Sequence, residues 1–392
     1  MAVQQIKDRI FSVGSRDWDR RLFDELIPLP DGTSYNSYLI RGSEKTALID
    51  TVDPPKTKEL ISNLKKLNIT KIDYLVSNHA EQDHSGSIPD LLEIYPEARV
   101  IANEKCRLFL MDLMEIPETR FQTVSDGDVL SLGDKNLKFI FTPWVHWPET
   151  MCTFLPEDKI LFSCDFFGSH LATSDLFVRN PAKVIEDAKR YYAEIMMPFR
   201  GVVKKNIEKI EALDFEMIAP SHGPVYSDSK IILDAYRNWV SDKVENQVVI
   251  AYVSMHGSTE KMMFYLMERI MEKGISVKFF NLITTDLGQL AMSLVDSATL
   301  ILGTPTVLTG PHPAAVYAAT LVNVLKPKLK FPTVVGSYGW GGRTLEMIQN
   351  SLSNLKAEFL DPVLIKGYPK AADYGLLDKL VDTIATKHQE TI

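Results

Sequence analysis

The second half of the chain alternates strand-like and helix-like segments, and this rhythm constrains the fold more than any other feature. From Val248 to Lys387, five short apolar runs each precede a segment with apolar residues at helical spacing. Such an alternation is typical of a parallel sheet with helices on both faces, because each right-handed crossover returns the chain to the same sheet. The pattern predicts an α/β, doubly wound, five-stranded parallel sheet.

The first half follows a different pattern of short strands and irregularly placed helices. Residues 35–40 and 45–50 are predicted strands around a turn, and residues 56–67 have apolar side chains at helical spacing. This mixture predicts an α+β unit with two sheets packed between helices. The pattern changes in the polar stretch before Val248, so we expect one domain over residues 1–245 and a second over residues 246–392.

The segment from His79 to His84 concentrates potential metal ligands directly after an apolar strand. Three isolated residues of the same kind follow near the ends of later strands or in a tight turn. The complete set is His79, Glu81, Asp83, His84, His146, Asp165 and His222. Buried without partners, these groups would cost several kcal/mol, whereas imidazoles and carboxylates together are common transition-metal ligands. Seven are enough for two metal ions, although each isolated one could alone be an ordinary core or turn residue.

Three loops at the carboxyl ends of strands in the second half have the composition of a ligand site. The first is rich in small and hydroxyl residues and leads into a helix, whose N-terminus favours a phosphate. The third contains aromatic residues that could cover a flat ring, and ligands of open α/β sheets bind at this edge. A plain capped turn is the alternative interpretation. The candidates are Ser254, Met255, His256, Gly257, Ser258, Thr259, Thr304, Pro305, Thr306, Ser337, Tyr338, Gly339, Trp340 and Gly341.

Charge and cysteine content exclude several other classes. Lys and Arg number 43 and Asp and Glu 51, a net charge of −8, whereas nucleic-acid binding needs a basic surface. Residues 1–21 contain no apolar leader, and no apolar run reaches the ~20 residues of a membrane span. The three cysteines form no C-x-x-C pair, which disfavours zinc or iron–sulfur sites held by cysteine. We therefore expect a cytoplasmic protein that binds neither nucleic acid nor membranes.

Together, the motifs resemble the flavodiiron protein family. The H-x-E-x-D-H segment and its isolated partners resemble the flavodiiron branch of the metallo-β-lactamase fold, an αββα sandwich. The three loops resemble a flavodoxin-like domain that binds FMN. The resemblance implies two non-haem irons. One would be held by His79, Glu81, His146 and Asp165, and the other by Asp83, His84, Asp165 and His222, with Asp165 bridging.

Two further site residues follow from the resemblance alone. It implies that His170 handles protons near the irons, although an ordinary core histidine is an equal alternative. It also implies a tyrosine on the substrate side of the irons, and of the pair Tyr191 and Tyr192 we predict Tyr192.

The resemblance implies an enzyme that reduces dioxygen to water, nitric oxide to nitrous oxide, or both, with electrons delivered through FMN. No rubredoxin-like cysteine pairs follow the flavodoxin half, so the expected donor is a separate protein, rubredoxin in this family. A head-to-tail homodimer is implied, and a dimer of dimers could form from it.

Two alternatives belong to other classes. One is a dinuclear zinc hydrolase of the metallo-β-lactamase superfamily fused to a flavodoxin domain. Glu81 argues against it, because it stands where hydrolytic members carry a second histidine, and a hard anionic oxygen favours iron. The other is a non-catalytic electron carrier with a degenerate first domain, and the complete ligand set argues against that.

Overall fold

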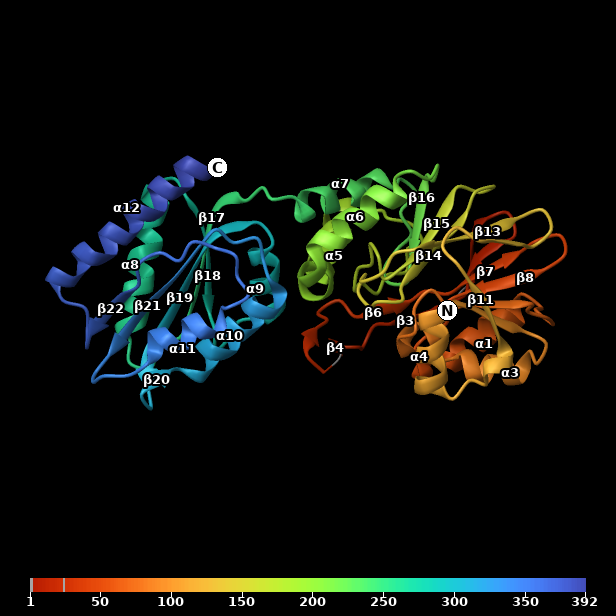
Figure 1. The fold of residues 1–392 in the computed structure, drawn as a ribbon, viewed down its shortest axis with the longest axis horizontal. Coiled ribbons are helices and arrows are strands. Elements are labelled where there is room, and N and C mark those ends of the chain that lie inside the picture. Colours follow the sequence, from red (N-terminus) through yellow and green to blue (C-terminus); the bar gives the residue numbers. More distant parts are fainter. Residues whose placement is uncertain (1–2, 24) are drawn as a thin grey trace. The chain divides into compact units, whose positions relative to one another are not determined.

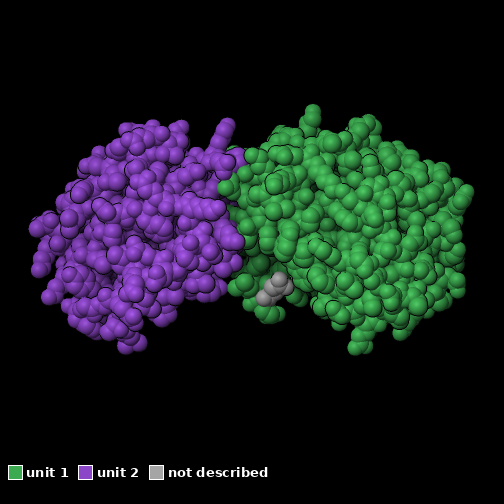
Figure 2. All heavy atoms as spheres, viewed as in Figure 1, with its two compact units in different colours: residues 1–240 green, residues 241–392 purple. Residues whose placement is uncertain are grey.

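The computed structural model describes residues 3–23 and 25–392, and the chain divides into two compact units, residues 1–240 and 241–392. Figure 2 shows the two units in different colours. The division follows helix α7 (Lys230–Val240) and precedes strand β17 (Glu245–Tyr252). It therefore falls in the polar stretch where the sequence pattern changes.

The first unit contains two sheets packed face to face between helices (Figure 1). The larger sheet has the order β1 (Gln4–Lys7), β2 (Ile10–Ser12), β7 (Tyr38–Arg41), β8 (Thr46–Ile49), β9 (Tyr74–Val76), β10 (Arg99–Asn103) and β11 (Phe121–Val124). The second has the order β12 (Val129–Ser131), β13 (Asn136–Phe141), β14 (Met151–Leu155), β15 (Ile160–Cys164) and β16 (Met217–Pro220). Two further antiparallel sheets have two strands each: β3 (Ser15–Asp17) pairs with β6 (Thr33–Tyr35), and β4 (Leu22–Phe23) pairs with β5 (Ile27–Pro28).

Alternation of side chains along the strands separates two apolar layers in this unit. In β7, Leu39 packs in the layer under the helices, while Tyr38 and Ile40 face the second sheet, as the two-residue period of a strand requires. The helices are α1 (Thr57–Lys66), α2 (Gln82–Ser85), α3 (Ile88–Ile94), α4 (Glu104–Met114), α5 (Pro181–Tyr191), α6 (Arg200–Ile210) and α7. The predicted sandwich is confirmed.

The second unit is a parallel sheet with helices on both faces. The strand order is β18 (Ser276–Asn281), β17, β19 (Ser297–Val307), β21 (Phe331–Tyr338) and β22 (Val363–Lys366). One apolar layer holds α8 (Ser258–Glu272) and α12 (Tyr374–Thr391), and the other holds α9 (Leu287–Leu294), α10 (Pro313–Leu325) and α11 (Thr344–Ser351). This confirms the doubly wound prediction, and the order 2-1-3-4-5 is that of flavodoxins.

One strand is longer than the sequence pattern predicts. The apolar run suggested an end near Gly303, but β19 continues to Val307, because its last residues pair with the short antiparallel strand β20 (Gly310–Pro311). Thr304 to Thr306 are therefore strand residues rather than a free loop. Among the described helices, none combines the length and apolar character needed to cross a bilayer.

Candidate metal centre and flavin site

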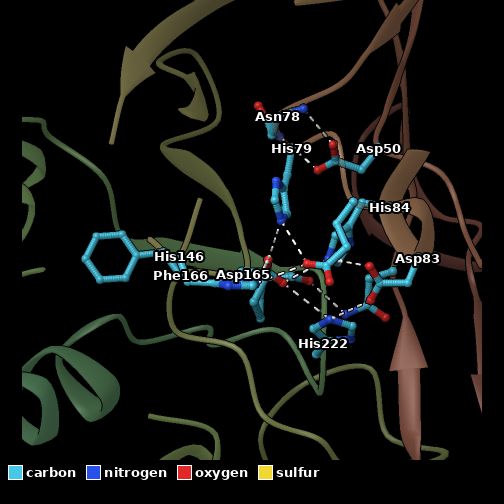
Figure 3. A network of polar contacts seen from close by, with 12 residues as sticks. Asp50, Asn78, His79, Asp83, His84, His146, Asp165, Phe166 and His222 are labelled. Carbon is cyan, nitrogen blue, oxygen red and sulfur yellow. Dashed lines mark hydrogen bonds and ion pairs between the residues drawn. The ribbon is translucent and has the colours of Figure 1, made fainter. Parts of the chain in front are cut away.

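The first unit brings all seven predicted metal ligands together at one edge of its two sheets. Figure 3 shows the ligands His79, Asp83, His84, His146, Asp165 and His222. His79 follows β9, and α2 begins three residues later. Asp165 and His222 follow β15 and β16, which are parallel neighbours. The carboxyl ends of parallel strands lie side by side, so these two residues reach the same point. His146 comes from the connection between β13 and β14.

Four of the ligands form a first group around one oxygen of Asp165. Asp165 Oδ2 lies 3.4 Å from Nε2 of His79 and 3.6 Å from Nε2 of His146. Glu81 Oε2 lies 3.0 Å and 3.1 Å from the same two nitrogens. One ligand atom from each residue lies within 4.8 Å of the others, a spacing suited to a single ion.

The remaining ligands form a second group around the other oxygen of Asp165. Asp165 Oδ1 lies 2.9 Å from Nε2 of His84 and 3.3 Å from Nε2 of His222. The two oxygens of Asp83 lie 3.2 Å and 3.3 Å from the same nitrogens. Asp165 thus presents one oxygen to each group, which is the arrangement of a carboxylate that bridges two ions.

The charges in the cluster favour cations. Burial disfavours a charged His79, but hydrogen bonds with carboxylates, first that of Glu149, raise its pKa well above the ordinary value. For His222, Asp165 and Asp83 outweigh burial and raise the pKa to about 10. Burial alone would raise the pKa of Asp165, yet the surrounding imidazoles hold it well below its ordinary value. A metal ion that binds such ligands displaces their protons and supplies positive charge in place of those protons.

Unsatisfied polar atoms show that the residues fit metal ions. In the described part of the chain, several buried ligand atoms have no hydrogen-bond partner. They are both oxygens of Asp83 and of Asp165, and Nε2 of His84 and of His222. Leaving such groups unsatisfied costs about 1–3 kcal/mol each, and the donor set of imidazoles and carboxylates suits iron.

Glu149 is a functional candidate that the sequence reasoning missed. Its Oε1 accepts from His79 Nδ1 at 2.6 Å and from the backbone N–H of Ala80 at 3.1 Å, and its side chain is fully buried. Because a carboxylate accepts, the proton of His79 lies on Nδ1 and Nε2 faces the cluster. The available signal was its position three residues after His146, within the same segment.

Replacing Glu149 by alanine is expected to lower the affinity for iron about 10- to 100-fold, the usual cost of losing a partner that orients a ligand. Glu149→Gln keeps an oxygen that can accept from His79 and is expected to lose less. Iron titration of both variants measures the difference. Equal affinity in the alanine variant and the native chain would contradict this role.

The structure places His170 beside the cluster. Of the two tyrosines, it places Tyr191 rather than Tyr192 there. The His170 ring lies 4.8 Å from that of His222, between centroids, and is buried. Tyr191 lies 4.8 Å from His170 and 5.8 Å from His222, whereas Tyr192 packs on Tyr236 at 5.4 Å, away from the ligands. Consecutive helical residues point about 100° apart, so only one can face the cluster. The candidate is therefore Tyr191, in place of the predicted Tyr192.

The second unit contains a cavity of about 400 Å³ at the carboxyl edge of its sheet. Eleven of the fourteen predicted residues line it: Ser254, Met255, His256, Ser258, Thr259, Pro305, Thr306, Ser337, Tyr338, Gly339 and Trp340. The others are Gly257, which caps α8 with φ +82°, Thr304, whose buried hydroxyl accepts from the backbone N–H of His312, and Gly341. The extended β19 adds Val307, and Leu308 directly after it and Gly367 complete the wall.

The cavity fits a phosphate with an attached flat ring. A Cβ on Gly339 or Gly367 would meet nothing within 4 Å, so the backbone leaves room for a ligand. Ser254 Oγ is buried near the N-terminus of α8 and has no partner among the described residues. A helix N-terminus and a free hydroxyl both favour an anion. Trp340 is 65% exposed at the rim, where its ring can cover a ligand.

Comparison with known proteins gives matches over both units. The model of the ODP family of β-lactamase-like proteins matches residues 33–223, and the flavodoxin model matches residues 250–375. A nitric oxide reductase of Moorella thermoacetica is 35% identical over 362 residues, 91% of this chain and 90% of that one. A coenzyme F420H2 oxidase of Methanothermobacter marburgensis is 36% identical over 324 residues, 80% of each chain.

Solved structures match the whole chain. Rubredoxin oxygen:oxidoreductase of Desulfovibrio gigas gives a TM-score of 0.96 at 30% identity, covering 99% of both chains. The flavodiiron protein of Giardia intestinalis gives 0.92 at 27% identity, covering 99% of this chain and 98% of that one. The relatives that match both units are named as reductases and oxidases, so the chain is an oxidoreductase. The chain belongs to the flavodiiron protein family, whose two cofactors, a diiron centre and FMN, correspond to the two sites described above.

Proposed function

We propose that this protein reduces dioxygen to water, nitric oxide to nitrous oxide, or both, with electrons that pass through FMN to an iron pair held by the seven ligands. The observation that carries the proposal is the position of Asp165, whose two oxygens each face one ligand group within a buried cluster. The names of the relatives, nitric oxide reductase and rubredoxin oxygen:oxidoreductase, support both substrates.

The two cofactors together supply the electrons that the reaction needs. Reduction of dioxygen to water takes four electrons, of which two ferrous ions provide two and a reduced flavin two. The chain contributes position and charge. Glu81, Asp83 and Asp165 would balance the positive charge of the irons, and Glu149 fixes the tautomer of His79. The buried ring of Tyr191 packs beside the ligand His222, at 5.8 Å between ring centroids.

The partners are proposed from the family. We expect an external electron donor, and the name of the Desulfovibrio gigas relative points to rubredoxin. A head-to-tail homodimer, in which the flavin of one copy approaches the irons of the other, would bring the two sites together. Analytical ultracentrifugation measures the assembly, and a monomer with full turnover would contradict the dimer.

The first test is cofactor content followed by gas consumption. Anaerobically purified protein is expected to hold about two irons and one FMN per chain, and to consume dioxygen or nitric oxide once a donor reduces the flavin. The two gases are compared under the same donor flux. Zinc in place of iron, with hydrolytic activity on an ester and no gas consumption, would contradict the proposal.

Replacing Glu81 by histidine is expected to weaken iron retention and reductase turnover. The change removes a negative, hard oxygen donor 3.0 Å from His79 Nε2 and substitutes a neutral imidazole of the kind that zinc hydrolases use. Iron and zinc bound from an equimolar mixture measure the effect, and Glu81→Asp, which keeps the carboxylate, is the matched control. Unchanged iron content and turnover in Glu81→His would overturn the role of this position.

A further inference from the structure

Thr33 lies between two histidines at the metal cluster. Its hydroxyl is fully buried on β6, with Oγ1 3.0 Å from Nδ1 of His170 and 3.4 Å from Nδ1 of His222. Neither the motif nor the resemblance points to this residue. The question is which histidine receives the single proton that the hydroxyl can donate.

The tautomer of His222 follows from its other neighbour. Nδ1 of His222 lies 2.6 Å from the backbone carbonyl of Ser34. A carbonyl only accepts, so this nitrogen carries the proton and Nε2 is free to face the carboxylates of the cluster. Nδ1 of His222 therefore cannot accept the hydroxyl proton of Thr33.

The hydroxyl proton of Thr33 then goes to His170. The other acceptor within reach is the Ser34 carbonyl, which already accepts from His222 at 2.6 Å and lies 3.4 Å from the Thr33 hydroxyl, farther than His170 Nδ1. Nδ1 of His170 at 3.0 Å is the better acceptor. A neutral imidazole that accepts at Nδ1 carries its proton on Nε2.

Nε2 of His170 is buried and has no hydrogen-bond partner among the described residues. The ring lies between Phe23 and Tyr191, with centroid distances of 5.0 Å and 4.8 Å, and beside His222. A buried N–H without an acceptor is costly, so a bound molecule that offers an oxygen atom to this N–H would be favoured.

We propose that Thr33 is a positioning residue that holds His170 in the tautomer with the proton on Nε2, so that this N–H donates a hydrogen bond to an oxygen atom of the gas reduced at the cluster. The identity of the acceptor rests on the proposed function, whereas the tautomer does not. Dioxygen and nitric oxide both offer oxygen acceptors, and the donor is in place before either binds.

The tautomer is tested by nitrogen NMR of the full chain with FMN bound and zinc in place of the paramagnetic irons. The His170 signals are assigned by their loss in His170→Gln. The native chain is expected to show an unprotonated Nδ1 and a protonated Nε2 at this residue. Thr33→Val, of equal size but without the hydroxyl, should shift the population toward a protonated Nδ1, and Thr33→Ser should keep the native pattern.

Turnover and iron content complete the test. Thr33→Val is expected to lower kcat about 10-fold or more while iron and FMN per chain stay at native values, because Ser34 still fixes His222. Thr33→Ser should recover most of the rate. A native His170 protonated on Nδ1, an unchanged spectrum in Thr33→Val, or loss of iron in that variant would each overturn the proposal. Absence of gas reduction in the native chain would overturn the proposed function but leave the tautomer result standing.

Discussion

Replacing Asp165 by alanine is expected to remove iron from both positions of the cluster and abolish gas reduction. Its two oxygens each face one ligand group, at 2.9 Å from His84 and 3.4 Å from His79. No other residue in the described part of the chain belongs to both groups. Its loss would also leave the imidazoles of the cluster without their shared counter-charge, at a site where burial makes uncompensated charge expensive. Iron is expected to fall from about two per chain toward none.

FMN is expected to remain bound in Asp165→Ala. Every residue that lines the flavin cavity belongs to the second unit, and that unit has its own two apolar layers. Iron and flavin are measured on the same sample, by elemental analysis and by fluorescence of released FMN. Loss of both iron and flavin would contradict the prediction that FMN binding does not depend on the metal cluster.

Asp187→Ala is the matched control for loss of a buried carboxylate. Asp187 lies on α5, is 5% exposed and pairs with Lys183 at 2.6 Å. Burial raises its pKa to about 6, so the folded chain disfavours its charged form. This variant is expected to keep both irons. Iron loss equal to that of Asp165→Ala would mean that the effect arises from general destabilisation.

The metal ligands were predictable because they either lie close together in the sequence or directly follow apolar strands. Four lie within six residues, and Asp165 and His222 end two apolar runs that become parallel neighbours. Glu149 and Thr33 were not predictable in this way. Each acts by a hydrogen bond to a residue far along the chain, His79 in one case and His170 in the other, and only the tertiary fold brings these pairs together.

The tyrosine at the cluster shows a second limit of sequence reasoning. Tyr191 and Tyr192 are adjacent aromatic residues at the end of α5, and a π-helix, η3 (Tyr192–Met196), begins at the second of them. Adjacent helical residues point about 100° apart, but the sequence does not show which of two equivalent rings faces the ligands, because the packing of α5 decides it. The extension of β19 has a similar cause, since it depends on pairing with β20.

Replacing Gly339 by leucine is expected to lower FMN affinity about 10- to 100-fold, since filling a site that a ligand must occupy costs about 1–3 kcal/mol. Gly339 lines the cavity, and a Cβ there would meet no protein atom within 4 Å. The new side chain therefore begins in space that the ligand would occupy, and its Cβ meets no protein atom. Gly375→Leu is the matched control, because that glycine has equally open surroundings in α12 of the same unit and does not line the cavity.

The Gly339→Leu variant also tests the contributions of the iron pair and of FMN separately. Iron content should stay at the native value, since all seven ligands lie in the first unit. Steady-state gas consumption driven by an external donor should fall in proportion to the flavin lost, because electrons no longer reach the irons through FMN. Protein reduced chemically beforehand should still convert nitric oxide to nitrous oxide in a single turnover, since the two electrons stored by the iron pair balance the reduction of two nitric oxide molecules, whereas dioxygen needs four. Full steady-state turnover without FMN would show that electrons enter at the metal centre directly, and the flavodoxin unit would then need another role.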